Sequence, residues 1–242
     1  MDMNDIKGLC FDKDGTLFDF AATWEAWAKA FLLRLSAGDM ATATRIGHTI
    51  EFDMIRQKFA PTSVVIAGTA KEVADALLPH FPHLSPSSLL EVLNEEAERA
   101  PQRPAVPLAP LLTEFRGKGL RLGVATNDAE SPARAHLAQA GVTDMFDFIA
   151  GYDSGFGGKP APGQLLAFAA HVGLMPDQIV MIGDSTHDLR AGRAAGMTTI
   201  GVLTGPATQD QLAGLADAIL PDIGHLPAWL ATRNPTEPRP AR

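Results

Sequence analysis

Residues 6–17 read IKGLCFDKDGTL, an apolar run that passes directly into two aspartates and a glycine. An apolar stretch of this length that ends in a turn signal indicates a buried strand followed by a tight turn. Further short apolar runs resemble it, and stretches of helical length separate the later ones. These runs are residues 121–126, 146–150, 179–182 and 198–203. Strands that alternate with helices over short connections predict an α/β fold built on a parallel sheet with helices on both faces.

Three helices are predicted between the later strands. Ser131 is expected to cap the first of them, with Pro132 in its first turn and Gly141 at its end. The other two helices cover residues 162–172 and 185–195, and a glycine follows each of them. Glycine commonly ends a helix because it adopts the left-handed conformation without strain.

The segment 20–102 breaks this alternation because it contains no convincing strand. Its apolar residues recur at helical spacing, which predicts helices over residues 22–35, 40–59, 69–78 and 86–99. Residues 64–67 are left as a connection. We therefore expect a Rossmann-like α/β core, an inserted all-helical cap and a disordered proline- and arginine-rich tail. The expected bounds are 1–19 and 103–230 for the core, 20–102 for the cap and 231–242 for the tail.

Composition narrows the function classes. The chain has 242 residues, is 46% hydrophobic and carries a formal net charge of −8 at pH 7. This acidic balance argues against a partner that is a nucleic acid or an anionic membrane. Cys10 is the single cysteine, so no intrachain disulfide can form, and it is expected to be a small buried apolar residue. With no signal peptide or membrane-spanning run in view, we expect a cytoplasmic monomer or homodimer.

Polar side chains follow the predicted strands at the points where they end. In open parallel sheets these ends meet at one edge, which is where ligands bind. The residues expected to gather there are Asp12, Asp14, Thr126, Asn127, Lys159, Asp184 and Asp188. Clustered carboxylates repel one another, and a divalent cation with oxygen ligands resolves the repulsion. The site therefore favours Mg²⁺, with Mn²⁺ also possible, and Lys159 and the helix after Asp184 add positive potential for a phosphate group.

The order of these residues resembles the four motifs of the haloacid dehalogenase-like hydrolase superfamily. The motifs are Asp12-Lys13-Asp14-Gly15-Thr16-Leu17, Thr126-Asn127, Lys159-Pro160 and Gly183-Asp184 with Asp188. The resemblance covers roughly residues 5–20 and 105–228. The helical insertion lies between the first two motifs, where members similar to phosphoglycolate phosphatase, β-phosphoglucomutase and phosphonatase carry a cap. The overall plan is most similar to the phosphoglycolate phosphatase-like branch.

The resemblance implies a role for each motif residue. Asp12 is expected to be the nucleophile that forms an aspartyl-phosphate, and Asp14 the general acid and then the base. Thr126 and Asn127 are expected to hold the transferring phosphoryl group, while Lys159 neutralises its charge. For Mg²⁺ the implied ligands are the Asp12 carboxylate, the Asp14 backbone carbonyl and Asp184. Asp188 is expected to support the metal shell or to orient Lys159.

Several alternatives remain open at this stage. The expected activity is hydrolysis of a small phosphorylated metabolite similar to phosphoglycolate, but a phosphomutase or a phosphonatase would use the same scaffold. A phosphonatase needs a cap lysine for a Schiff base, and the cap lysines are Lys29, Lys58 and Lys71. A non-catalytic metabolite-binding protein is a further alternative, although both Asp12 and Asp14 are retained. Asp188 also fits a helix cap, and the roles of Lys13 and His187 are left open.

The cap is expected to choose the substrate. On the helix predicted over residues 40–59, Arg45, His48, Phe52 and Arg56 fall on one face. Arg45 and Arg56 are therefore candidates to grip a substrate carboxylate or a second phosphate. The competing interpretation is a solvated or core-facing stripe that has no role in binding.

Overall fold

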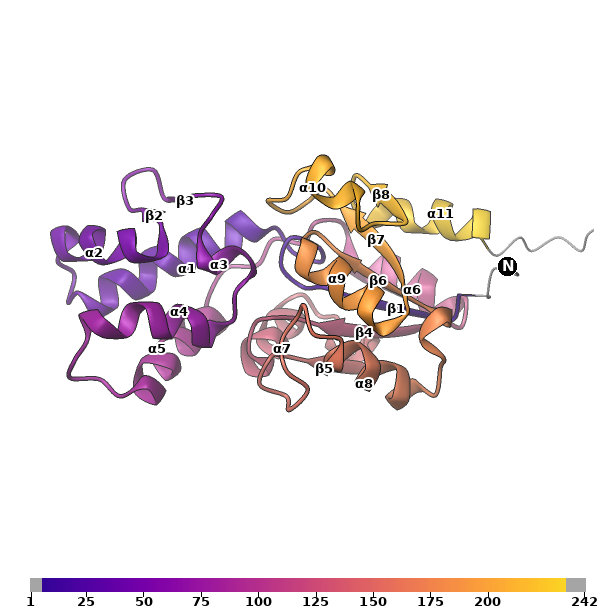
Figure 1. Ribbon diagram of the computed structural model, residues 1–242, viewed down its shortest axis with the longest axis horizontal. Coiled ribbons are helices and arrows are strands. Elements are labelled where there is room, and N and C mark those ends of the chain that lie inside the picture. Colours follow the sequence, from indigo (N-terminus) through magenta and orange to yellow (C-terminus); the bar gives the residue numbers. More distant parts are fainter. Residues whose placement is uncertain (1–5, 234–242) are drawn as a thin grey trace, which may run out of the picture.

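The computed structural model describes residues 6–233, and a parallel sheet forms the centre of the larger of its two lobes (Figure 1). The strands stand in the order β5-β4-β1-β6-β7-β8, and every neighbouring pair is parallel. Their bounds are Gly8–Phe11 for β1, Arg121–Ala125 for β4, Phe148–Ala150 for β5, Ile179–Gly183 for β6, Thr198–Val202 for β7 and Ala218–Leu220 for β8. The predicted α/β class is confirmed. The strand β8 was not predicted.

Alternate residues of the strands pack on opposite faces of the sheet. Leu9 and Phe11 join a large apolar cluster on one face, whereas Cys10 joins a second cluster on the other. Helices α6 (Leu108–Gly117) and α11 (Leu226–Arg233) supply side chains to the first cluster, and α8 (Gly163–Val172) and α9 (Thr186–Ala195) to the second. Both faces are covered, as predicted. Cys10 is fully buried, as predicted, and burial raises the pKa of its thiol to about 12.

The glycines predicted to end helices do so, whereas the serine predicted to begin one does not. Gly173 and Gly196 end α8 and α9 in the left-handed conformation, with φ of 68° and 78°. The cap predicted at Ser131 is wrong, because α7 (Glu130–Gln139) begins one residue earlier. The Ser131 hydroxyl instead donates a hydrogen bond to Glu98 at 2.5 Å.

The inserted segment forms its own lobe beside the sheet (Figure 1). Its helices are α1 (Phe20–Leu35), α2 (Met40–Gly47), α3 (Val64–Ala67), α4 (Ala70–Leu77) and α5 (Pro86–Glu98). Asp19 caps α1 and Ser85 caps α5, where Pro86 takes the first helical position. The buried apolar residues of this lobe, from Phe20 to Ala100, form a third cluster separate from the two on the sheet.

The cap is not all-helical, and the helix predicted over residues 40–59 is wrong. After α2 ends, the short 3-10 helix η1 (His48–Ile50) leads to Glu51, whose φ is 54°. Strands β2 (Phe52–Asp53) and β3 (Lys58–Phe59) then form an antiparallel hairpin. The left-handed residue stops the helix, and packing of the Phe52 and Phe59 rings at 4.8 Å stabilises the hairpin. The periodicity of residues 40–59 thus comes from two different structures.

The predicted tail begins too early. Residues 231–233 belong to α11, and residues 234–242 lie outside the described part of the chain. Within residues 6–233, no helix has both the length and the apolar content that crossing a bilayer requires.

Candidate active site

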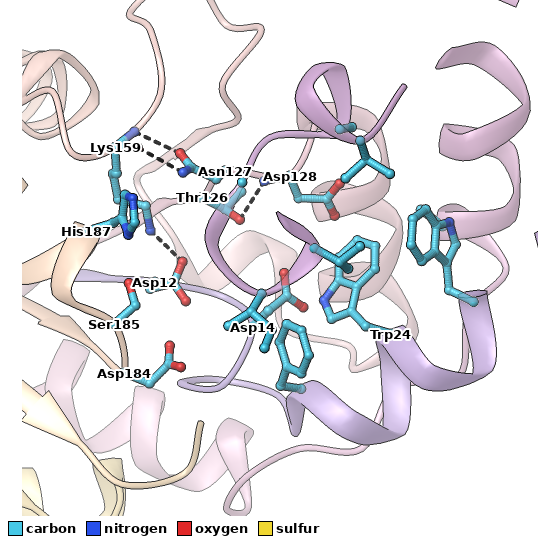
Figure 2. Close-up of a pocket in the computed structure, with 18 of the residues that line it drawn as sticks. Asp12, Asp14, Trp24, Thr126, Asn127, Asp128, Lys159, Asp184, Ser185 and His187 are labelled. Carbon is cyan, nitrogen blue, oxygen red and sulfur yellow. Dashed lines mark hydrogen bonds and ion pairs between the residues drawn. The ribbon is translucent and has the colours of Figure 1, made fainter. Parts of the chain in front are cut away.

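The three central strands deliver their terminal residues to one pocket (Figure 2). Asp12 follows β1, Thr126 follows β4 and Asp184 follows β6, so the parallel topology alone brings them together. The pocket has about 660 Å³ of empty space, part of it open to solvent. The predicted core residues all line it, namely Asp12, Asp14, Thr126, Asn127, Lys159, Asp184 and Asp188. His187, whose role was left open, lines it as well.

Lys159 links two of the carboxylates. Its Nζ lies 2.5 Å from Asp12 Oδ1 and 2.6 Å from Asp188 Oδ1, and it donates a hydrogen bond to the carbonyl of Ala125 at 2.7 Å. Burial opposes the charge of this lysine. The two carboxylates outweigh that effect and raise its pKa above the usual range. Lys159 is therefore a fixed cation beside Asp12.

One lysine does not balance the carboxylates around it. Oxygen atoms of Asp12, Asp184 and Asp188 lie within 4.8 Å of one another, and all three residues are buried. Burial, with smaller contributions from neighbouring carboxylates, raises the pKa of Asp12 to about 7 although Lys159 lowers it. Burial and the charges of Asp12 and Asp188 raise the pKa of Asp184 well above its usual value. The cluster thus has excess negative charge and only oxygen donors, which fits a divalent cation such as Mg²⁺.

The two oxygens of Asp188 do different work. Oδ2 accepts hydrogen bonds from the backbone N–H and the hydroxyl of Ser185, at 3.0 and 2.7 Å, which closes a capping box on α9. Oδ1 faces Lys159. The helix-cap interpretation of Asp188 is confirmed, and the same side chain also orients the lysine.

Two glycines confine the Asp184 carboxylate. Gly15 turns the chain after β1 with φ of +81°, and a Cβ there would lie 2.5 Å from Asp184 Oδ2. A Cβ on Gly205, which follows β7, would lie only 1.7 Å from the same oxygen. The Thr16 hydroxyl donates to Asp184 Oδ1 at 3.4 Å. Asp184 is therefore held by backbone that approaches too closely for any side chain, and the part played by Gly205 was not predicted.

Asn127 fixes the loop that carries the lysine. Its side-chain NH₂ donates to the Lys159 carbonyl at 2.9 Å, and its Oδ1 accepts from the Lys159 backbone N–H at 2.8 Å. Thr126 Oγ1 accepts from the Asp128 backbone N–H at 3.1 Å. The amide of Asn127 thus positions Lys159, which is a different use from the phosphate contact expected of it.

Lys13, whose role was open, lies at the centre of a buried ion cluster. Its Nζ is 2.7 Å from Asp14, 3.3 Å from Asp128 Oδ2 and 2.8 Å from His136 Nδ1, and no part of it is exposed. It also lies 5.5 Å from the centre of the Trp24 ring, a cation–π distance. The cluster joins the loop after β1 to the cap.

His136 completes this cluster as a neutral side chain. Its Nε2 lies 2.6 Å from the carbonyl of Ala97 in α5, so Nε2 donates there and Nδ1 accepts from Lys13. Burial and then the charge of Lys13 lower the pKa of His136 to about 4. Sequence reasoning missed Asp128 and His136 here. Lys13 could have indicated them, because it stands in an otherwise buried motif and a buried lysine requires charged or polar partners.

The cap side of the pocket is apolar, and neither predicted arginine reaches it. Arg45 is exposed on α2, and Arg56 is 83% exposed on the hairpin, 3.9 Å from Asp53. The single helix face that suggested their role does not exist, because α2 ends at Gly47. Of the cap lysines, none lines the pocket. The cap residues that do line it are Phe20, Trp24, Trp27, Val65, Ile66, Gly68, Ala70, Val73, Leu93, Asn94 and Ala97.

Comparison with known proteins agrees with this geometry. The model of the haloacid dehalogenase-like hydrolase family matches residues 6–196. A phosphoglycolate phosphatase of Xylella fastidiosa is 30% identical over 217 residues, which cover 85% of this chain and 86% of that protein. One from Rhodospirillum rubrum is 36% identical over a shorter region, 52% of each chain. A crystal structure of a predicted phosphoglycolate phosphatase from Haemophilus somnus 129pt covers 94% of this chain and 99% of its own, with a TM-score of 0.72 at 20% identity.

Proposed function

The chain belongs to the haloacid dehalogenase-like hydrolase family, and from that premise we propose that it is a Mg²⁺-dependent phosphatase of a small phosphorylated metabolite. The observation that carries the proposal is the position of Asp12. Its carboxylate lies in a pocket with a fixed cation, Lys159, the buried acid Asp184 and the partly buried acid Asp14. A carboxylate becomes an effective nucleophile toward a phosphate ester only where the charge of that ester is neutralised.

The proposed reaction divides its steps among the side chains of the pocket. Asp12 attacks phosphorus and forms an aspartyl-phosphate, while the bond from phosphorus to the alcohol oxygen breaks. Asp14 gives its proton to that oxygen and then takes a proton from the water that attacks the aspartyl-phosphate. This second attack releases phosphate and restores Asp12. Lys159 stabilises the charge on the phosphoryl oxygens, with Asn127 and Asp188 holding it in place.

The cation fits the chain's own donor set. Asp12 and Asp184 with the Asp14 carbonyl would hold Mg²⁺, and Asp188 would support them through Ser185 and Lys159. Bound there, the metal supplies charge neutralisation for the phosphoryl group. We propose that Thr126, which directly follows β4 and is 2% exposed, contacts the same group. The nucleophilic attack and the proton transfers are carried out by the side chains of Asp12 and Asp14.

The substrate, the cellular location and the oligomeric state are also part of the proposal. The relatives are named phosphoglycolate phosphatases, so phosphoglycolate is the first compound to test. We expect a cytoplasmic monomer or homodimer that acts on a free metabolite and not on a nucleic acid or a membrane. A phosphonatase is disfavoured, because Lys58 pairs with Glu25, Lys71 pairs with Asp75 and neither lines the pocket.

The test is phosphate release from a panel of small phosphate esters, including 2-phosphoglycolate, hexose phosphates and nucleotides. We expect release with Mg²⁺, none with EDTA, and none from Asp12→Asn. Folding of the variant is checked by circular dichroism. Release that survives Asp12→Asn in a pure preparation would show that another residue is the nucleophile. Absence of release from every ester, with the protein folded and Mg²⁺ present, would move the assignment to a mutase or a binding protein.

A further inference from the structure

The two halves of the pocket differ in chemistry. The core half supplies the acids and Lys159, whereas the cap half is aromatic and aliphatic (Figure 2). Trp24 and Phe20 from α1, Ile66 from α3 and Val73 from α4 form that wall. Since the phosphate must lie against the core half, the rest of the ester lies against the cap wall. The cap wall therefore determines which leaving group is accepted.

Positive charge for a second anionic group is absent from the cap wall. Among the described residues that line the pocket, Lys159 is the single lysine or arginine, and Asp12 and Asp188 already hold it. Lys13 lies near Trp24, but it is fully buried and is bound to Asp14 and Asp128. A carboxylate on the leaving group would lose its water without gaining a cationic partner from the cap wall, which is unfavourable.

The helix end in the cap wall does not replace that missing charge. Helix α4 begins at Ala70, which lines the pocket, but its first turn is already capped. The Thr69 hydroxyl accepts from the Glu72 backbone N–H, and the Glu72 carboxylate accepts from the Thr69 backbone N–H at 2.6 Å. The positive end of the helix dipole is therefore matched to a carboxylate of the chain itself.

Asn94 offers the wall one neutral hydrogen-bonding group. It lines the pocket from α5, and its Oδ1 is buried without a hydrogen-bond partner among the described residues. In contrast, the Trp27 indole N–H already donates to the Leu93 carbonyl at 3.0 Å. An unpaired buried amide oxygen is satisfied by a single hydrogen-bond donor on a ligand.

We propose that the pocket selects a phosphate monoester with an uncharged, largely apolar leaving group, an aliphatic or aromatic alcohol with room for one neutral polar group at Asn94. This inference rests on the proposed phosphatase function and deepens it. It implies that phosphoglycolate, the substrate named for the relatives, is a poor substrate of this chain. A pocket that distinguishes two substrates by one small group typically does so by roughly 10- to 200-fold. We expect kcat/KM for benzyl phosphate to exceed that for 2-phosphoglycolate by at least about tenfold.

The experiment compares these two esters in the wild type and in two variants that each add one arginine to the cap. Ile66→Arg places the cation in the cap wall. Ile55→Arg is the matched control, because Ile55 is 87% exposed on the hairpin and does not line the pocket. We expect Ile66→Arg to shift the ratio of kcat/KM values toward 2-phosphoglycolate by about tenfold, and Ile55→Arg to leave the ratio unchanged. A wild type that prefers 2-phosphoglycolate would overturn the inference while leaving the phosphatase intact.

Binding separates this inference from the proposed activity. Calorimetry with Mg²⁺ compares 2-phenylethylphosphonate with 3-phosphonopropionate, in which a methylene replaces the ester oxygen of benzyl phosphate and of 2-phosphoglycolate. We expect the phenyl compound to bind at least about tenfold more tightly. Tighter binding of the phenyl compound without hydrolysis of any ester would refute the phosphatase and support the selectivity of the wall. Tighter binding of 3-phosphonopropionate would overturn the inference whatever the activity.

Discussion

Replacing Lys13 by methionine tests the buried ion cluster. The substitution keeps an unbranched side chain of similar length and removes the charge. Asp14 and Asp128 would then share a buried site without the cation that lies 2.7 and 3.3 Å from them. Burial already raises the pKa of Asp128 to about 6 with the lysine present. The variant therefore leaves two carboxylates close together and uncompensated.

The magnitude follows from burial. Removing one partner from a buried ion pair typically costs about 3–5 kcal/mol in the free energy of unfolding. For a chain of this size each kcal/mol lowers the melting midpoint by roughly 2–4 °C, so we expect a fall of about 6–20 °C. The matched control is Lys118→Met, because Lys118 pairs with Glu114 at 2.6 Å on the exposed surface. An exposed pair at this spacing contributes about 0.5 kcal/mol or less.

Thermal unfolding followed by circular dichroism measures both variants at pH 7.5 without metal. A double variant, Lys13→Met with Asp128→Asn, removes one stranded carboxylate and should recover roughly 1–3 kcal/mol. A midpoint for Lys13→Met no lower than that of Lys118→Met would refute the argument. It would mean that water or protonation satisfies the acids and that Lys13 is not the cation that holds them.

Three further outcomes are expected. Gly205→Ala should weaken Mg²⁺ affinity by roughly 10- to 100-fold, because its methyl would lie 1.7 Å from Asp184 Oδ2. Gly214→Ala is the control, since a Cβ there meets nothing within 4 Å. Equal Mg²⁺ affinity in both variants would contradict the claim that Gly205 confines the Asp184 carboxylate. The folded-state pKa of Asp12 is raised from 3.8 to about 7. The stability that protonated Asp12 contributes without metal is therefore present at low pH and is lost as pH rises through 7. Above that pH the acid is ionised, which is the form that binds Mg²⁺. The melting shift caused by Mg²⁺ should thus be larger at pH 8 than at pH 6, and an equal shift would count against this site. Cys10 should resist iodoacetamide in the native protein and react after unfolding, whereas rapid native labelling would disprove its burial.

The α/β core could be predicted because local sequence patterns determine its strands. Apolar runs between polar turns set the strands, and parallel topology brings their ends together, so Asp12, Thr126 and Asp184 were placed without a structure. The cap was harder. Residues 40–59 have helical periodicity, but the left-handed Glu51 and the packing of the Phe52 and Phe59 rings favour a hairpin, and the spacing shows neither.

The parts of the site that were missed depend on long-range contacts. Lys13 and His136 are 123 residues apart in sequence, and the packing of α7 against α5 gives the histidine its second partner, the Ala97 carbonyl. Gly205 contacts Asp184 because β7 lies beside β6. Trp24 is buried in the apolar cluster of the cap, and it also forms part of the pocket wall.

The most direct test of the central claim is to find where the phosphoryl group is attached during turnover. The enzyme is mixed with Mg²⁺ and the phosphorus-labelled ester that the panel identifies as the best substrate, quenched in acid within one turnover, digested and mapped by mass spectrometry. We predict a hydroxylamine-sensitive phosphoryl group on Asp12, absent when Mg²⁺ is removed and absent from Asp12→Asn. A phosphoryl group on any other residue, or hydrolysis with no attached phosphoryl group in an Asp12→Asn protein that still turns over, would contradict the account.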